Sequence, residues 1–296
     1  MSVKNRILSF SEFLNESAQE PEVPTHVTNI LAKTMKMPYA EFLKKLGEDA
    51  SDPKFIAAIK AGRQDGVKED EAMFFKGPTM VEVKTLIPMQ NEIDIKESLA
   101  FQLKGRENKF WSEEILTKIL RGEGVTVKAP LVIFNNKYIV DGHHRWSQVY
   151  AMNKDSKIEV LNIVPKNTKL SPLGMLKVVQ MSIAAAIGKV PIENVKGTNM
   201  LRAPADKIKD YVIKEISDET LTLMKNIRKI ESKEAAADYI WSNVEAMQKN
   251  NQPIAGAPKR DLMPQTDKDE TGEWEDRLKK GKINFLPKFK VKGDIE

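Results

Sequence analysis

Residues 129–146, APLVIFNNKYIVDGHHRW, predict two strands, a tight turn and a helix in direct succession. Leu131 to Phe134 is an apolar strand, and Lys137 to Val140 is a second one. The intervening Asn135-Asn136 suits the positive φ angles of a two-residue hairpin turn. Asp141-Gly142 then turns the chain into a helix that we expect from about residue 143 to residue 153.

The flanking sequence adds the other elements of a small α+β unit. From Met80 an alternating pattern predicts a half-buried strand that ends at residues 86–88, and a polar loop with three carboxylates follows at 90–97. A helix is predicted over 113–121 because Ser112 can cap its start and Gly122 can end it. A further strand is predicted over 158–164. We therefore expect a small mixed sheet with helices.

The turn between strand and helix has the chemistry of a phosphate site. The first N–H groups of a helix lack partners within the helix, and the helix dipole adds positive charge there. Gly142 allows close approach of a ligand, and Arg145 can donate two parallel hydrogen bonds to phosphate oxygens. Asp141 can hold Mg²⁺ or cap the helix. Consecutive helical residues point roughly 100° apart, so we expect one histidine of the pair to face a ligand and the other to pack or bond to the backbone.

The run from Val140 to Trp146, preceded by its hairpin, resembles the signature turn of the ParB/sulfiredoxin superfamily. The upstream Leu86-Ile87-Pro88-x-Gln90 resembles the opening strand of that superfamily, so the resemblance covers about residues 80–164. Sulfiredoxins carry a reactive cysteine where this chain has His143, which excludes peroxiredoxin repair. The Gly-Glu-Arg-Arg-type turn of the CTP-hydrolysing ParB proteins also differs from this one, whereas Asp-Gly-His-His-Arg is the form found in free-serine kinases of the superfamily.

The resemblance implies Mg²⁺- and NTP-dependent phosphoryl transfer or hydrolysis, with ATP, ADP or CTP as the nucleotide. It places the phosphates on Gly142, His143, His144 and Arg145, with His144 and Arg145 also stabilising charge, and the metal ion on Asp141. An acidic residue after the first strand acts as general base in the kinases. By position this is Glu92, with Asp94 and Glu97 as rivals.

Two other functions remain open at this stage. A ParB-like nuclease would use Asp141 and the histidines with a metal ion on DNA. A non-enzymatic DNA-binding or structural head protein would keep the fold as a scaffold. Fold-level analogy does not choose among the three, because function depends on the site.

The N-terminal segment, residues 1–24, has apolar residues at helical spacing and predicts a short amphipathic helix that docks on the body or targets the protein. Its residues Phe10 to Glu16 resemble the capsid-targeting peptides of internal head proteins in T-even-type tailed phages. The resemblance implies cleavage by a prohead protease between Glu16 and Ser17, with phage head proteins as partners. It locates the protein in the capsid interior, or otherwise in the host cytoplasm.

The remaining segments are predicted to be helical or extended. Residues 25–79 are predicted to contain helices over 26–37, over 39–46 and after Pro53, and residues 170–249 form a helical module. Helices are expected there over 171–187, 205–216, 218–230 and 232–248. Residues 250–273 are polar and contain three prolines, which predicts an extended linker before a basic tail.

The composition of the chain excludes several classes of protein and of site. The 296 residues are 41% hydrophobic and 30% charged, and no apolar run approaches the roughly 18 residues that span a bilayer, so we expect no membrane partner. Cysteine is absent, which excludes disulfides and thiolate metal sites. The net charge is +5, yet residues 277–292 alone carry seven cations and no acid.

Any DNA binding would therefore depend on the tail rather than on the near-neutral body. Lysines there alternate with two phenylalanines, a layout that suits a phosphate backbone with stacked bases. The candidate nucleic-acid-binding residues are Lys279, Lys280, Lys282, Phe285, Lys288, Phe289 and Lys290.

Overall fold

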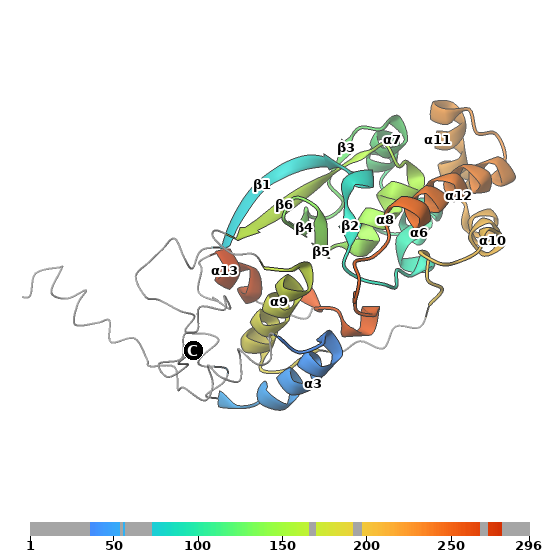
Figure 1. Ribbon diagram of the computed structural model, residues 1–296. Coiled ribbons are helices and arrows are strands. Elements are labelled where there is room, and N and C mark those ends of the chain that lie inside the picture. The colour runs from blue at the N-terminus through green and yellow to red at the C-terminus, as the bar shows by residue number, and fades with distance from the viewer. Residues whose placement is uncertain are drawn as a thin grey trace, which may run out of the picture.

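The computed structural model describes residues 36–53, 56, 73–165, 170–191, 197–266 and 272–279. Its centre is a mixed sheet with helices on both sides (Figure 1). The strands follow the order β1-β6-β4-β5-β2, and β3 pairs with β6 outside this path. The predicted α+β class is therefore confirmed. The strands are β1 (Met73–Glu82), β2 (Ile87–Pro88), β3 (Gly124–Val125), β4 (Leu131–Phe134), β5 (Tyr138–Asp141) and β6 (Lys157–Pro165).

Helices make up most of the remaining described chain. They are α3 (Tyr39–Asp49), α6 (Ile95–Leu103), α7 (Glu113–Arg121), α8 (His143–Met152), α9 (Pro172–Ile187), α10 (Ala205–Glu215), α11 (Asp218–Arg228), α12 (Lys233–Asn250) and α13 (Glu273–Lys279). Three short 3₁₀ turns lie between elements: η1 (Val83–Thr85) between β1 and β2, η2 (Gly105–Glu107) between α6 and α7, and η3 (Arg260–Leu262) between α12 and α13. Among these described helices, none has the length and apolar character needed to cross a bilayer.

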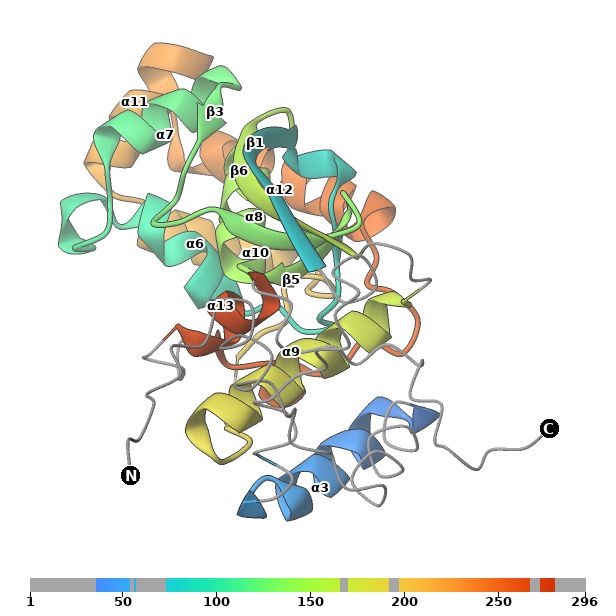
Figure 2. The same ribbon diagram turned by 90° about the vertical axis from the view of Figure 1, so that its left-hand side faces the viewer.

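Strand β4 is buried on both faces of the sheet. Its successive residues point to opposite sides, and each side packs in a different apolar cluster. On β4, Leu131 and Ile133 join an apolar cluster that contains residues of α6, α7, α8, α10, α11 and α12. Val132 and Phe134 join a second cluster with residues of α3, α9 and α13. Figure 2 shows α9 and α13 on one side of the sheet, with α3 beyond them. The result is a three-layered arrangement in which β4 is the middle strand of the sheet.

Local signals in the sequence correspond to the observed elements. Asn135 and Asn136 have φ angles of 53° and 58°, as the two-residue hairpin requires. Helix α7 begins and ends where predicted: Ser112 Oγ accepts from the N–H of Ile115 at 3.3 Å, and Gly122 ends the helix with φ 80°. Both ends of α7 are therefore fixed by residues within the helix or next to it.

Two predicted boundaries around the first strand are wrong. Strand β1 begins at Met73 rather than Met80, because residues 73–76 pair with the far end of β6. The expected loop over 90–97 ends early, since Asp94 caps helix α6 by accepting from the N–H of Glu97 at 3.0 Å. Glu97 thus lies in the first turn of a helix.

The expected linker after residue 250 packs against the sheet. Asn251 is buried; its amide donates to the carbonyls of Lys84 and Leu86, and its Oδ1 accepts from the Tyr150 hydroxyl. Further along, the N–H of Asn91 donates to the Pro258 carbonyl at 2.9 Å. The prediction of an extended linker is therefore wrong for residues 251–266, because tertiary hydrogen bonds override the polar, proline-containing composition.

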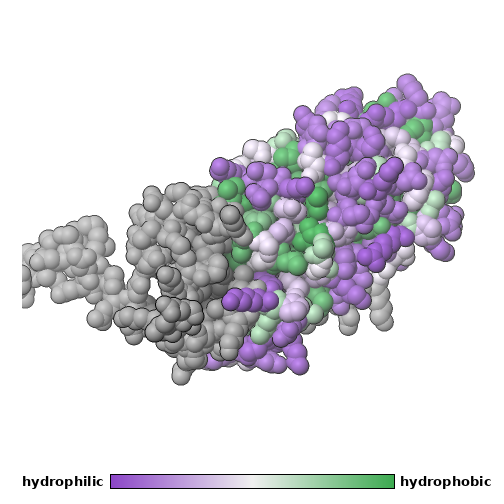
Figure 3. Space-filling view, in the orientation of Figure 1, coloured by the Kyte–Doolittle hydropathy of each residue, from purple (hydrophilic) through white to green (hydrophobic). Residues whose placement is uncertain are grey.

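The predicted helical module at 170–249 divides between the two clusters. Helix α9 packs in the second cluster, whereas α10, α11 and α12 pack in the first. Hydrophilic residues predominate over α10–α12 on the face shown in Figure 3. Most of the predicted helix over 26–37, most of the one after Pro53, and the segments 1–24 and 280–296 lie outside the described residues.

Replacing Asn251 with alanine tests this packing. The change leaves two backbone carbonyls and the Tyr150 hydroxyl without their partner, so we expect the free energy of unfolding to fall by about 3 kcal/mol. Urea titration of Asn251→Ala measures it, with Asn250→Ala, an exposed neighbour, as control. Equal stability of the two variants would contradict the packed arrangement.

Candidate functional site

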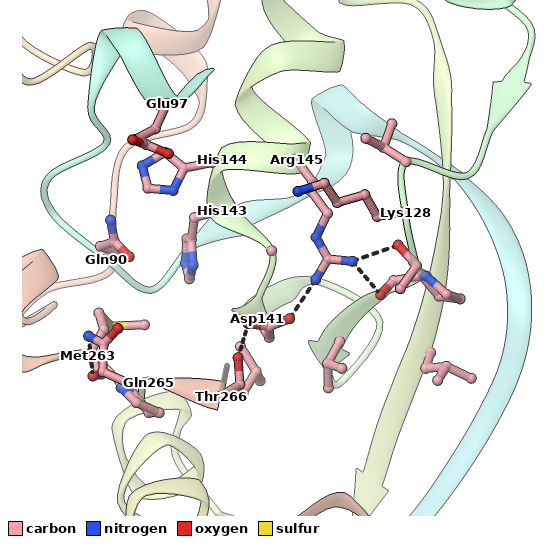
Figure 4. Close-up of a pocket in the computed structure, with 18 of the residues that line it drawn as sticks. Gln90, Glu97, Lys128, Asp141, His143, His144, Arg145, Met263, Gln265 and Thr266 are labelled. Carbon is pink, nitrogen blue, oxygen red and sulfur yellow. Dashed lines mark hydrogen bonds and ion pairs between the residues drawn. The ribbon is translucent and has the colours of Figure 1, made fainter. Parts of the chain in front are cut away.

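The predicted turn lies at the floor of a cavity of about 680 Å³. The walls come from β5, α6, α8, the segment before β4 and C-terminal residues within 260–266 and 272–274. Figure 4 shows Glu97 on the side of His144, Lys128 on the side of Arg145, and Met263, Gln265 and Thr266 along a third side. All five turn residues, 141–145, line this cavity.

Gly142 is required at the junction of β5 and α8 for two reasons. Its φ of 95° is left-handed, a conformation that strains other residues. A Cβ atom there would also lie 2.4 Å from Leu131 Cδ2 and 2.9 Å from Arg145 Nη2. Because Gly142 is itself the N-cap, no side chain caps α8, and the first N–H groups of the helix are left for another acceptor.

His143 connects the turn to the residue that follows β2. Its Nε2 accepts from the N–H of Met89 at 3.1 Å, so the proton of the ring lies on Nδ1. Burial lowers the pKa of His143 to about 3, and the nearby His144, Arg260 and Arg145 add to the effect. The ring is therefore neutral at physiological pH and positions residues 89–90 at the cavity.

Two hydrogen-bond donors lie next to the ring of His144, which can accept only one hydrogen bond when it is neutral. Arg260 Nη1 lies 2.8 Å from its Nδ1, and the N–H of Asp94 lies 3.3 Å from its Nε2. A neutral imidazole accepts at one nitrogen only, so the two donors compete. Burial first, and then Arg260, lower the pKa of His144 to about 3. Both histidines thus bond to the backbone, whereas the sequence predicted this of one.

Arg145 lines the cavity, but its guanidinium group already has hydrogen-bond partners in the protein. Its Nη1 donates to the carbonyls of Ala129 and Pro130 at 2.6 and 3.1 Å, and its Nη2 pairs with Asp141 Oδ2 at 2.5 Å. The other oxygen of Asp141 accepts from the Thr266 hydroxyl at 2.7 Å. Both candidate roles, phosphate fork and metal ligand, would need some of these bonds to open.

The three candidate carboxylates lie in different surroundings. Glu97 is exposed and lines the cavity, whereas Glu92 is half-buried and is not among the lining residues. Asp94 is buried as the cap of α6, and its Oδ2 has no hydrogen-bond partner. The carboxylate that reaches the cavity is therefore Glu97. Within the described residues, no group of three or more metal-ligating side chains comes together.

Five polar residues that the sequence motifs did not indicate complete the cavity: Lys128, Gln148, Arg260, Gln265 and Thr266. Two of them carry buried atoms without a hydrogen-bond partner, the Nε of Arg260 and the Oε1 of Gln148. Among the described residues, Arg260 also has no carboxylate partner. Buried polar groups are almost always satisfied in proteins, so these two atoms indicate a ligand or water in the cavity.

The other predicted site residues are not brought to this cavity in the described part of the chain. Lys279 ends helix α13, and the remaining tail residues from Lys280 onward lie outside the described residues. The predicted processing site at Glu16 and Ser17 lies outside them as well.

Comparison with known proteins gives no family for this chain. No protein-family model, curated protein or solved structure matches it.

The neutral histidines predict a pH dependence of stability. The pKa of each is about 3 in the fold, against an ordinary value of 6.5, so between these pH values the unfolded chain binds protons that the fold does not. Stability is therefore full above pH 6.5 and falls on acidification, by up to about 1.4 kcal/mol per pH unit for each histidine.

Urea titrations between pH 7 and pH 5 measure this slope. In His143→Gln, the amide oxygen can still accept from Met89 but cannot gain a proton, so the variant should lose about half of the histidine contribution to the slope. An unchanged slope would mean that His143 is not held neutral.

Proposed function

We propose that the cavity binds the phosphates of a nucleotide and catalyses Mg²⁺-dependent phosphoryl transfer or hydrolysis. The observation that carries the proposal is the unbalanced charge of Arg260. This guanidinium touches the neutral His144 ring, its Nε is buried without an acceptor, and no carboxylate among the described residues pairs with it. An uncompensated charge in a partly buried site is costly, and an anionic ligand removes that cost.

The charges around the cavity favour an anion. Arg145 and Asp141 neutralise each other, and both histidines are uncharged. The groups left over are the cations Arg260 and Lys128 and the carboxylate of Glu97. An anion would therefore meet an excess of positive charge.

The open start of α8 supports phosphate in particular. Its uncapped N–H groups and the positive end of the helix dipole face the same cavity as Arg260. Backbone donors at a helix start together with an arginine are the usual protein partners of phosphate oxygens. The resemblance of the turn to that of the superfamily kinases supports the same ligand.

Glu97 supplies a general base for the transfer step. In the proposed reaction an acceptor hydroxyl or water attacks the terminal phosphorus, its proton passes to Glu97, and the bond to the leaving phosphate oxygen breaks. The unpartnered Oε1 of Gln148 can accept a hydrogen bond from a hydroxyl or amino group of a ligand. Glu92 has no place in this proposal because it does not line the cavity.

Magnesium enters this proposal with the nucleotide. Mg²⁺ in nucleotide sites is held mainly by phosphate oxygens and water, with one or two carboxylates. Asp141 fits that role only in part, since both of its oxygens already accept hydrogen bonds. The ion, when bound, would neutralise phosphate charge.

Replacing Arg260 with methionine tests the phosphate site. We expect the dissociation constant for ATP with magnesium to rise about tenfold or more, because a charge-assisted hydrogen bond is lost. The melting temperature without ligand should stay equal or rise, because an unpaired charge is removed.

Calorimetric titration and thermal unfolding measure the two effects, with the exposed neighbour Lys259→Met as control. Wild-type protein that binds neither ATP nor any other nucleoside triphosphate would contradict the proposal.

Replacing Glu97 with glutamine tests the base. We expect the rate of ADP formation from saturating ATP to fall by about 10²-fold or more, with ATP affinity kept, because the amide cannot take the proton. Glu92→Gln is the matched control and should keep the wild-type rate. If Glu92→Gln loses the activity and Glu97→Gln keeps it, the assignment is wrong.

A further inference from the structure

An aromatic pair extends from the cavity wall to the protein surface. The rings of Phe101 and Phe110 are stacked, with centroids 5.3 Å apart and planes 28° apart. Phe101 lines the cavity, whereas Phe110 is 47% exposed. Large apolar side chains this exposed are unusual among the described residues, where Met80 is the other example. The exposed ring is therefore a flat apolar surface in contact with a residue that lines the cavity.

Two lysines surround this pair. Lys128 Nζ lies 3.8 Å from the Phe110 centroid and 4.7 Å from the Phe101 centroid, and Lys109 Nζ lies 4.8 Å from that of Phe110. Burial, and then the charges of Arg145 and Lys109, lower the pKa of Lys128. The two lysines place positive charge beside the rings, which the carboxylate of Glu97 offsets in part, since it acts in the opposite direction on the pKa of Lys128.

The aromatic pair and the phosphate turn belong to one continuous wall. Lys128, which lines the cavity, has a left-handed φ of 63° and directly precedes Ala129. The carbonyl of Ala129 accepts a hydrogen bond from Arg145 at 2.6 Å. Lys128, which lies over the rings, is therefore the neighbour in sequence of a residue that contacts the arginine of the turn. A ligand with an anionic part and a flat aromatic part would contact the turn with the first and the two phenyl rings with the second.

We infer that Phe101, Phe110 and Lys128 seat the nucleobase of the nucleotide whose phosphates bind at the α8 turn. The inference rests on the proposed function. Stacking on a phenyl ring requires only the π-face that every base has. The two phenylalanines have no polar group that could recognise the edge of a particular base. The seat should therefore add affinity for nucleotides in general and discriminate weakly among ATP, GTP and CTP.

Comparison of ATP with inorganic tripolyphosphate, both with magnesium, separates the base from the phosphates. In Phe110→Ala we expect ATP affinity to fall about tenfold, as for loss of one stacked base, and tripolyphosphate affinity to remain unchanged. Phe110→Tyr keeps the ring and should keep ATP affinity. Met80→Ala, which removes a side chain of similar exposure in β1, should change neither.

The outcomes distinguish this inference from the proposed function. If the wild type binds tripolyphosphate as tightly as ATP, the phosphate site stands and the base seat is wrong. If Phe110→Ala weakens both ligands equally, or weakens only a single-stranded oligonucleotide, the assignment to a nucleobase is also wrong. If neither ATP nor tripolyphosphate binds, the proposed function fails and the inference fails with it.

Discussion

The ion pair between Asp141 and Arg145 is the interaction on which the arrangement of the cavity depends. It spans the junction between β5 and α8, which a left-handed Gly142 makes sharp enough for the two side chains to meet at 2.5 Å. The same two side chains also bond to the segment before β4 and to Thr266 of the C-terminal segment. One partly buried pair thus joins three separate stretches of chain, and removing either partner would leave the other without compensation.

This use of Arg145 changes how charge is divided in the site. An arginine that holds the loop carbonyls in place has few donors left for a ligand, so the positive charge that faces the cavity comes from Arg260 and Lys128. The histidines add none, because burial keeps both rings neutral. The turn therefore contributes backbone donors and geometry, whereas residues more distant in sequence contribute the cations.

The elements that could be predicted from the sequence are those with local physical causes. Asn135-Asn136 fixes the hairpin, Ser112 and Gly122 fix α7, and Gly142 fixes the junction, each through groups within a few residues. Asp94 and Glu97 also had a local signal: an acidic N-cap followed three residues later by glutamate is a capping pattern, and it identifies the start of α6. That pattern places Glu97 in a helix rather than in a loop.

The contacts that complete the cavity have no local cause. Arg260 reaches His144 across 116 residues, and Asn251 reaches Leu86 across 165. The composition of residues 250–273 predicts an extended linker rather than a packed segment, since it is polar and contains three prolines. Proline lacks an N–H but keeps its carbonyl, and the Pro258 carbonyl is one of the groups that hold this segment in place.

The C-terminal segment links the stability of the fold to the occupancy of the cavity. It brings Arg260 to the cavity with a buried, unpartnered Nε, and it also brings Thr266 to the ion pair. An anion that pairs with Arg260 would stabilise the segment as well as fill the cavity. The same charge that weakens the empty protein would then strengthen the complex, as is common where function is built at the expense of stability.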